Sequence, residues 1–316
     1  MPNVRPGRYK LMLAVLATAS VALAACSSSS KNPGTSGESS STKSTTTSST
    51  LFSMLPASIQ SSKVVTLATE AEYPPCESMS SNNQTMIGYE PDLWNAMAAK
   101  LGVKIDASSI AFDSLIPGVQ SGRYDMAMEC ISDNTAREQQ VTFVDNAYAT
   151  GAVYTLASNT SITTNPLSLC GLTTATQQGL DLAQQIESTF DPYCTQHGKA
   201  KINLQQFPSE TAALLALYSG RVNFVLNDYA AAAALQAAAP KPLRYVTDPL
   251  LQKYYNGMVF NLKSVQLQKA FLAALKAIIA DGTYQAIMTK WKLPGLELTS
   301  PGINLAASKP LPTPSA

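Results

Sequence analysis

The sequence has few charged residues, a single histidine and none of the motifs that mark common enzymes. Lys, Arg, Asp and Glu make up 14% of its 316 residues, and the formal net charge at pH 7 is +1. Because it has no run of basic residues, the chain gives no sign of nucleic-acid binding. It also contains no Walker motif, no CxxC pair and no Ser-His-Asp arrangement. These absences argue against an ATPase, a zinc finger and a serine hydrolase, and we expect no cofactor and no metal.

The first 25 residues have the composition of an export signal. Three basic residues within positions 1–10 precede an apolar or small-residue stretch over 11–25, which is too short for a comfortable membrane span. The tetrapeptide Leu23-Ala24-Ala25-Cys26 is similar to a bacterial lipoprotein cleavage site. We therefore expect a lipoprotein signal peptide over 1–25 and a lipid on Cys26 that anchors the protein to the outer face of the cell membrane. An ordinary signal peptide followed by a free cysteine is the alternative.

Ser and Thr dominate the segment that follows the expected signal. Between Ser27 and Thr50, 17 of the 24 residues are Ser or Thr, and the others are Gly, Lys, Pro, Asn and Glu. Such a composition cannot bury enough apolar surface to fold, so we expect residues 26–60 to form a lipidated, flexible tether. The ~250 residues that remain are enough for two lobes of ordinary domain size.

The rest of the chain alternates short apolar runs with helical periods, which indicates the α/β fold class. Leu93, Met97 and Leu101 recur at four-residue spacing, and residues 270–278 have a similar apolar face, so both segments are expected to be core-facing helices. The apolar runs expected as strands are Val64–Leu67, Met126–Met128, Phe224–Leu226 and Met258–Phe260.

The stretch from Asp125 to Arg137 runs from a strand pattern into a helix start. Thr135 and Glu138 fit a capping box, which places Arg137 in the first turn. A guanidinium beside free backbone N–H groups suits a carboxylate, because the side chain offers a two-donor fork and the helix end offers partial positive charge. The alternative is that Arg137 pairs with a nearby acid on a solvated face.

Several longer segments follow one another in a distinctive order and at distinctive distances along the chain. They are TEAEYPP from Thr69, IGYEPDLWNAMAAKLGVK from Ile87, FDSLIPGVQSGRYD from Phe112, the Arg137 stretch with VTFVDNAYATG, GLTTATQQ from Gly171, SGRVNFVLND from Ser219 and ADGTYQAIMTKW from Ala280. Together they resemble the amino-acid-binding receptors of bacterial ABC importers, the extracellular solute-binding proteins of family 3. The resemblance covers roughly residues 63–304.

The resemblance implies a two-lobed, type II periplasmic-binding-protein fold with a ligand cleft between the lobes. Two connecting strands would form the hinge on which the lobes close. The implied parts are lobe 1 over 61–150 and 256–305, lobe 2 over 151–255, crossings near Ala149–Tyr154 and Tyr254–Met258, and a flexible tail over 306–316.

The same resemblance assigns roles to individual residues. Arg137 would hold the α-carboxylate of an amino acid, with Thr176 and Gln177 assisting from lobe 2, and Asp228 would hold the α-ammonium. A zwitterion needs one fixed cation and one fixed anion, so the assignment is chemically sensible. Asp228 also fits the N-cap of a following helix. The side-chain pocket would be lined by Glu70, Tyr73, Phe112, Glu129, Cys130 and Ser132.

Glu129 departs from the family pattern, which usually has a small residue at this position. Two carboxylates, Glu70 and Glu129, that point into a closed pocket repel each other unless a cation joins them. This favours a basic amino acid as ligand. The alternative is that Glu129 pairs with a Lys or Arg of the protein at the rim of the cleft.

Four cysteines follow Cys26, and an exported chain can keep them oxidised. Four cysteines allow three pairings. The resemblance places Cys76 and Cys130 just beyond neighbouring strands, which implies the disulfides Cys76–Cys130 and Cys170–Cys194. A zinc site is the rival interpretation, since the only histidine, His197, lies three residues after Cys194.

The resemblance favours a binding protein over an enzyme. We expect a monomeric, lipid-tethered receptor that delivers an amino acid to an ABC permease and its ATPase. The alternative is a cyclohexadienyl- or arogenate-dehydratase-like enzyme on the same fold, because a buried Glu129 with a raised pKa could act as a general acid. A sensory domain is a third possibility, for which the chain has no C-terminal membrane segment.

Overall fold

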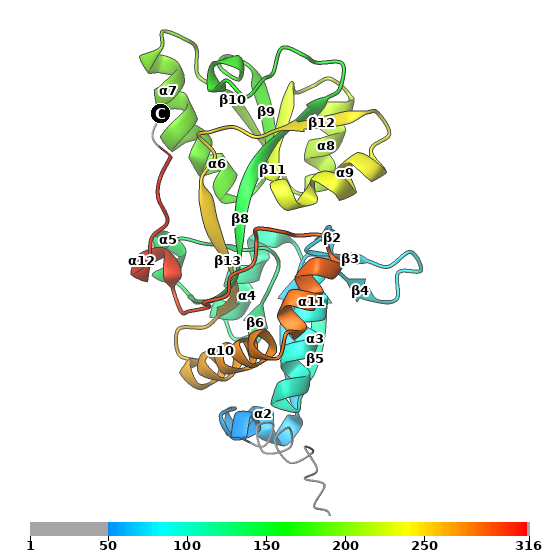
Figure 1. Cartoon of the computed structure of the whole chain (residues 1–316), viewed down its shortest axis with the longest axis vertical. Coiled ribbons are helices and arrows are strands. Elements are labelled where there is room, and N and C mark those ends of the chain that lie inside the picture. Colours follow the sequence, from blue (N-terminus) through cyan, green and yellow to red (C-terminus); the bar gives the residue numbers. More distant parts are fainter. Residues whose placement is uncertain (1–49, 315–316) are drawn as a thin grey trace, which may run out of the picture. The chain divides into compact units, whose positions relative to one another are not determined.

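The computed structural model describes residues 50–314 (Figure 1). The expected signal peptide, the lipid site Cys26 and most of the expected tether lie outside the described residues. Within 50–314, none of the helices combines the length and the apolar character needed to cross a membrane.

One long strand joins the two parts of a ten-stranded sheet. Strand β8 (Thr142–Leu156) pairs antiparallel with β13 (Lys253–Phe260) along its first part and with β11 (Phe224–Asp228) and β12 (Leu243–Val246) along its second part. In Figure 1, β8 and β13 run between the two lobes. Tyr254 of β13 lies opposite Ala149 of β8, within both expected crossings. The predicted two-lobed α/β fold with two connecting strands is confirmed.

Lobe 1 is built on parallel strands that end towards lobe 2. Strand β1 (Val64–Thr69) pairs in parallel with β5 (Lys104–Ser109) on one side and with β6 (Met126–Ala127) on the other. Strand β6 also pairs with β13, which runs antiparallel to it. The shorter elements of this lobe are η1 (Phe112–Ser114), β7 (Ser132–Asp133), α5 (Thr135–Glu138) and a small sheet of β2 (Glu72–Tyr73), β3 (Glu77–Met79) and β4 (Met86–Ile87).

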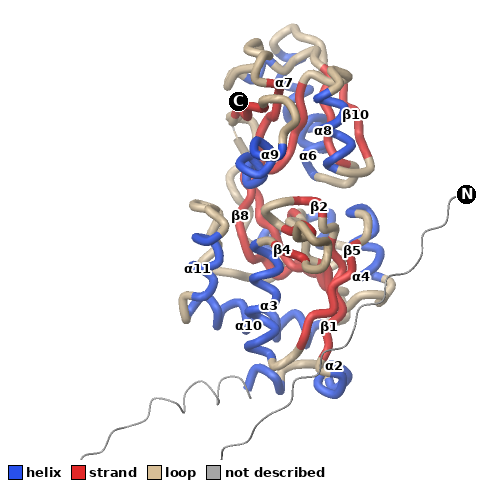
Figure 2. Tube along the Cα trace, turned by 90° about the vertical axis from the view of Figure 1, so that its right-hand side faces the viewer, coloured by secondary structure: helices blue, strands red, loops and turns tan. Residues whose placement is uncertain are grey.

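Helices cover both faces of the lobe 1 strands. Helices α3 (Tyr89–Leu101) and α10 (Val265–Ala280), both expected from their apolar spacing, pack on one face together with α11 (Thr283–Lys290) (Figure 2). Helix α4 (Leu115–Gln120) packs on the other face. Helix α3 ends at Gly102, whose φ of 66° is a left-handed conformation that glycine adopts without steric cost.

Lobe 2 has a second parallel core. Strand β9 (Thr173–Gln177) pairs in parallel with β10 (Asn203–Phe207) and with β11. One apolar cluster lies beneath α8 (Glu210–Tyr218). Another lies beneath α6 (Asp181–Gln185) and α7 (Asp191–Gln196). The remaining elements are η2 (Pro166–Ser168), η3 (Ile186–Phe190), η4 (Tyr229–Ala231) and α9 (Ala232–Ala238).

The predicted end of the tether, at residue 60, is wrong. Residues 50–53 are helical, and α2 (Ala57–Ser62) begins after a break at residues 54–56. Leu51 of the first helical turn, Leu55 of the bend before Pro56 and Ile59 of α2 are all buried in the core of lobe 1. The folded part therefore begins by Thr50, where the Ser/Thr-rich composition ends.

The predicted flexible tail over 306–316 is also wrong in its first part. Helix α12 (Leu305–Ser308) begins the segment, and its Leu305 is buried beside Tyr255 and Leu298. The Tyr255 hydroxyl donates a hydrogen bond to the backbone oxygen of Lys309 at 3.0 Å. The partly buried Leu311 packs on the same cluster. This segment thus lies against the connecting strand β13 rather than extending freely from lobe 1.

Both disulfides implied by the resemblance are present. Cys76 and Cys130 are joined across lobe 1, with 6.0 Å between their Cα atoms, and Cys170 and Cys194 are joined in lobe 2, with 5.6 Å. Cys194 is therefore oxidised and cannot serve as the zinc ligand that the rival interpretation required. Among residues 50–314, no group of three or more His, Cys, Asp or Glu side chains is arranged to hold a metal ion.

Candidate functional site

The predicted ligand residues gather at strand ends that face the other lobe. Glu70 follows β1, Glu129 follows β6, and Gln177 and Asp228 end β9 and β11. The carboxyl ends of parallel strands are where open α/β sheets bind ligands. Nine of the ten predicted residues are buried, namely Glu70, Tyr73, Phe112, Glu129, Cys130, Ser132, Thr176, Gln177 and Asp228.

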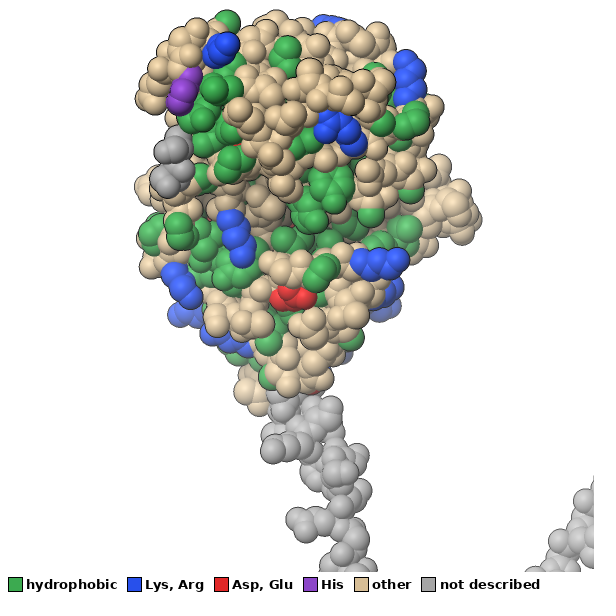
Figure 3. All heavy atoms as spheres, turned by 45° about the horizontal axis from the view of Figure 1, so that its top comes forward, with side chains coloured by type: hydrophobic (Ala, Val, Ile, Leu, Met, Phe, Trp, Pro, Cys, Tyr) green, Lys and Arg blue, Asp and Glu red, His purple; other side chains and the backbone are tan. Residues whose placement is uncertain are grey.

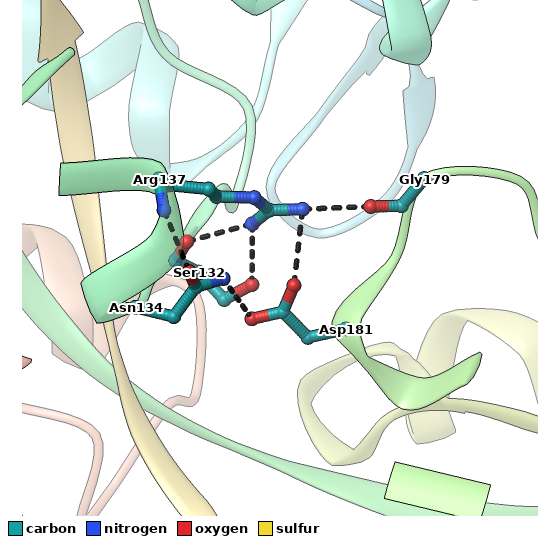
Figure 4. A network of polar contacts seen from close by, with 5 residues as sticks. All are labelled: Ser132, Asn134, Arg137, Gly179 and Asp181. Atoms are coloured by element: carbon teal, nitrogen blue, oxygen red, sulfur yellow. Dashed lines mark hydrogen bonds and ion pairs between the residues drawn. The ribbon is translucent and has the colours of Figure 1, made fainter. Parts of the chain in front are cut away.

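Arg137 reaches from lobe 1 to lobe 2 (Figure 4). Its Nη1 donates to the backbone oxygen and to Oγ of Ser132, each at 2.7 Å. Its Nη2 donates to the Gly179 backbone oxygen at 2.7 Å and forms an ion pair with Asp181 Oδ1 at 3.2 Å. Asn134 Nδ2 donates to the other oxygen of Asp181 at 2.8 Å. Arg137 therefore pairs with an acid, as the alternative interpretation held, but the acid comes from the facing lobe.

The helix that carries Arg137 begins differently from the prediction. The N-cap residue of α5 is Asn134, whose Oδ1 accepts a hydrogen bond from the Arg137 backbone N–H at 2.8 Å. The expected capping box of Thr135 and Glu138 does not form. Glu138 Oε1 instead accepts a hydrogen bond from the backbone N–H of Ala307 at 3.1 Å, so the C-terminal segment takes the carboxylate that a capping box would use.

Asp228 accepts hydrogen bonds from two tyrosines, Tyr73 of β2 and Tyr254 of β13. The Tyr254 hydroxyl donates to its Oδ1, and the Tyr73 hydroxyl lies 3.2 Å from its Oδ2. The same Tyr73 hydroxyl contacts Asn227, whose amide nitrogen donates to Glu210. Burial raises the pKa of Asp228 to about 6, against the effect of the tyrosine hydrogen bonds. Asp228 stands at the N-cap position of η4 but makes no side-chain capping bond there.

The lobes also meet through Glu70 and Phe112. Gln177 Nε2 donates to Glu70 Oε2 at 2.5 Å, and burial raises the pKa of Glu70 although this bond opposes the shift. The Phe112 ring packs against Gly179, where φ is +89° and an added Cβ would lie 3.2 Å from a ring carbon. Thr176 is fully buried, and its hydroxyl has no hydrogen-bond partner within the described part of the chain.

Glu129 lies among acids and has no basic partner. Its pKa is raised well above the usual value by burial and then by the charges of Glu70, Glu90 and Asp228. Glu77 is fully buried beside it, and its pKa is raised in the same way by burial, Glu129 and Glu90. Among residues 50–314, Glu129 forms no ion pair, so the alternative in which it pairs with a protein Lys or Arg is wrong.

The whole protein shows the same imbalance of buried charge. Among residues 50–314, eleven acidic residues are buried, whereas no Lys or Arg is. On the face drawn in Figure 3, Lys and Arg side chains are spread singly and acidic side chains are sparse. Buried acids without a cation are rare in stable proteins. Their concentration near Glu129 therefore calls for a cation from outside the chain or for protonation.

A pocket of about 380 Å³ opens beside the Arg137 contact. Asp181, which pairs with Arg137, and Tyr254, which binds Asp228, both line it, together with Asn134 and Lys253. None of the ten predicted ligand residues lines this pocket, so it lies beside the predicted site and not within it.

Sequence reasoning missed several residues of this site. Glu77 and Glu90 lie within or beside the segments of the family resemblance, but their burial behind Glu129 depends on how the small sheet folds over α3. Tyr254 lies in the expected crossing Tyr254–Met258, but that expectation did not indicate its contact with Asp228. Asp181 carried no signal at all, because its partner Arg137 is 44 positions away and in the other lobe.

Known proteins are similar to this chain over most of its length. The family pattern of bacterial extracellular solute-binding proteins, family 3, matches residues 65–294. A putative ABC transporter arginine-binding protein 2 of Escherichia coli is 30% identical over 241 residues, which cover 74% of this chain and 93% of that protein. An arginine-binding protein, ArgT, of Corynebacterium glutamicum is 28% identical over 239 residues, which cover 76% of this chain and 77% of that protein.

A solved structure has the same fold. The arginine-, lysine-, histidine-binding protein ArtJ from Geobacillus stearothermophilus is 27% identical, with a TM-score of 0.64 over 78% of this chain and 99% of that protein. The match spans both lobes and the two connecting strands that build the site. The chain belongs to the bacterial extracellular solute-binding proteins of family 3, and it is a solute-binding protein rather than an enzyme.

Proposed function

We propose that this protein captures a basic amino acid, with arginine as the first candidate, and delivers it to an ABC importer. The observation that carries the proposal is the buried acidic wall around Glu129, in which the described residues place no cation. A side chain with a positive charge would supply the missing partner. The names of the relatives from Escherichia coli and Corynebacterium glutamicum, both arginine-binding proteins, point the same way.

In the proposed complex, Arg137 holds the α-carboxylate and Asp228 the α-ammonium. Both groups already have partners of the matching chemistry, since Asp181 offers Arg137 a carboxylate and Tyr254 offers Asp228 a hydrogen-bond donor. The ligand would therefore exchange with these partners rather than meet bare charges. Thr176 and Gln177, at the end of β9, would assist Arg137 from lobe 2. The side chain of the ligand would extend towards Glu70 and Glu129.

We further propose that the protein is a monomeric lipoprotein, anchored to the membrane through Cys26. The support is the sequence alone, namely a basic and apolar leader that ends in Leu23-Ala24-Ala25-Cys26. A Cys26→Ser variant expressed in the native host should leave the membrane fraction. Unchanged retention in membranes would remove the lipid anchor and leave the binding proposal intact.

A ligand panel tests the binding proposal directly. Thermal shift of the mature protein is measured with arginine, lysine, ornithine, histidine and glutamine. A ligand at a hundred times its Kd adds about 2.7 kcal/mol to the folded state, which such a scan detects. We expect arginine, lysine or ornithine to raise Tm more than glutamine does. A panel in which glutamine gives the largest shift would overturn the choice of a basic ligand.

The dehydratase alternative has less support. Glu129 is buried and holds a raised pKa, as a general acid would. However, the matching family and the relatives described above are solute-binding proteins. Incubation with prephenate or arogenate, followed by analysis of the products, should show no turnover. Product formation would support the dehydratase alternative.

A further inference from the structure

Three glutamates lie together, almost completely buried, in lobe 1. Glu77 comes from β3, Glu90 from α3 and Glu129 from the loop after β6. Their exposed fractions are 0%, 0% and 1%. Both carboxyl oxygens of Glu77, one of Glu90 and one of Glu129 find no hydrogen-bond donor among residues 50–314. Oxygens that can only accept therefore face one another, unless protons lie between them.

Among residues 50–314, no Lys or Arg is buried beside these three residues, which we call the glutamate cluster (Glu77, Glu90 and Glu129). The titratable groups that act on it are the carboxyls of Glu70 and Asp228 and the hydroxyls of Tyr73 and Tyr89. Burial raises the pKa of all three glutamates, that of Glu90 to about 7, and their mutual repulsion adds to the shift for Glu77 and Glu129. Carboxyls in such a group ionise in steps and share the protons that remain.

The backbone holds the glutamates in place. Glu77 follows Cys76 and Glu129 precedes Cys130, so the Cys76–Cys130 disulfide keeps these two carboxyls beside each other. The Cys130 backbone N–H donates to Glu90 at 3.0 Å. At Gly88, with φ of +153°, any Cβ would lie 2.0 Å from the Cys76 backbone oxygen, so the start of α3 is pressed against the same disulfide. These contacts hold the backbone segments that carry the three carboxyls close together.

From this geometry we infer that the protein binds its cationic ligand in exchange for a proton of the glutamate cluster. The inference rests on the proposed function and specifies how its pocket works. When the charged end of the ligand approaches Glu129, its positive charge stabilises the carboxylate form, and the proton that the cluster held passes to solvent. One positive charge enters and one leaves, so the buried site keeps its net charge. No bond of the ligand is made or broken.

The proposed exchange predicts that pH changes the affinity for a charged ligand more than the affinity for a neutral one. At a pH where the cluster holds its proton, that proton competes with arginine, so the affinity for arginine should rise about tenfold per pH unit if one proton is released. Arginine keeps its side-chain charge throughout this range, because its pKa lies above ~12. A neutral amino acid brings no side-chain charge to the cluster, so its affinity should stay nearly constant above about pH 7, where Asp228, with a pKa of about 6, is ionised and can hold the α-ammonium.

Calorimetric titration measures the released proton directly. Arginine is titrated into the mature protein at about pH 7 in phosphate and in Tris, two buffers that differ in ionisation enthalpy. The difference in observed binding enthalpy gives the number of protons released, and we expect about one. Glu77→Gln should still bind arginine but should release far less than one proton. The affinity of the wild type at about pH 6 and about pH 8 provides a second readout that needs no variant.

Glu210→Gln is the matched comparison. Glu210 is also buried, with a pKa raised to about 8, but it contacts Asn227 in lobe 2 and lies outside the glutamate cluster. Proton release should persist in this variant. Release that disappears in Glu210→Gln and persists in Glu77→Gln would overturn the inference, as would tight arginine binding with the same enthalpy in both buffers. If arginine, lysine and ornithine all fail to bind, the proposed function itself is wrong, and the exchange falls with it.

Discussion

Arg137 and Asp181 join the two lobes through an ion pair, with 3.2 Å between Nη2 and Oδ1. Asp181 thereby presents a carboxylate to the guanidinium for which the family resemblance predicts the carboxylate of the ligand. Asn134 and the Gly179 backbone complete the contact. A protein acid that occupies the position of a ligand group competes with the ligand, so this pair should lower affinity while it holds the lobes together.

Replacement of Asp181 tests that competition. In Asp181→Asn the amide cannot pair with Arg137 as an ion, and we expect arginine to bind about fivefold more tightly, which corresponds to about 1 kcal/mol for a partly exposed ion pair. Calorimetric titration measures the change. The control is Glu187→Gln, which removes an exposed acid of η3 and should leave Kd unchanged. A weaker affinity in Asp181→Asn would mean that Asp181 supports the ligand instead.

Loss of Arg137 should abolish binding of every amino acid. In Arg137→Ala the ligand carboxylate would enter a closed cleft unpaired, at a cost of several kcal/mol. The affinity for arginine and for any neutral ligand should therefore fall by at least about a hundredfold. Arg123→Ala, which removes an exposed guanidinium of lobe 1, is the control. Comparable losses in both variants would show that lobe 1 is damaged rather than the site.

Glu129 should discriminate between charged and neutral side chains. In Glu129→Gln we expect arginine to weaken by about 1.5–3 kcal/mol, the worth of a hydrogen bond to a charged group, while glutamine changes little. The measurement is calorimetric titration of both ligands into the wild type and the variant. Glu72→Gln, an exposed neighbour on β2, should behave as the wild type. Equal losses for arginine and glutamine would contradict a role in reading the side-chain charge.

The two disulfides should differ in their effect on the ligand. Loss of either, as a Cys→Ser pair, should lower stability by about 3–4 kcal/mol in the chain-entropy model. Only Cys76→Ser with Cys130→Ser should also weaken arginine binding, because this bridge holds Glu77 and Glu129 together. Cys170→Ser with Cys194→Ser serves as the comparison. Thermal unfolding and titration of both pairs decide the matter, and equal binding by the two variants would defeat the prediction.

Stability of the ligand-free protein should fall as the pH rises. Burial raises the pKa of Asp133 to about 7 and of Asp145 to about 8, so the folded state holds protons that the unfolded chain releases between about pH 4 and pH 8. We expect Tm to be several degrees lower at about pH 8 than at about pH 5.

Asp145→Asn provides the variant for this measurement. Its amide oxygen can still accept the hydrogen bond that Asp145 takes from the Leu305 backbone N–H at 3.0 Å, while the titrating carboxyl is removed. The drop in Tm should become smaller. A wild type whose Tm rises from pH 5 to pH 8 would contradict the sign of the effect.

Features that depend on neighbouring residues could be predicted from the sequence. The four-residue spacing of Leu93, Met97 and Leu101 predicts α3, since an apolar stripe can be buried only along one helix face. The order of the family segments predicted the two lobes, the two crossings and both disulfides. The prediction of a tether from composition failed at residues 51–60, because Leu51, Leu55 and Ile59 are buried in the core of lobe 1.

Only the tertiary structure decided which charges meet. The sequence by itself marked Arg137, Asp228 and Glu129 as charged groups of one cleft, because each has a distinct place in the segments it shares with the family. It could not pair Arg137 with Asp181 or bring Glu77 and Glu90 behind Glu129, since these contacts join elements distant in the chain. Coulomb energy and desolvation depend on distance and burial, and a linear sequence specifies neither until the lobes have folded and closed.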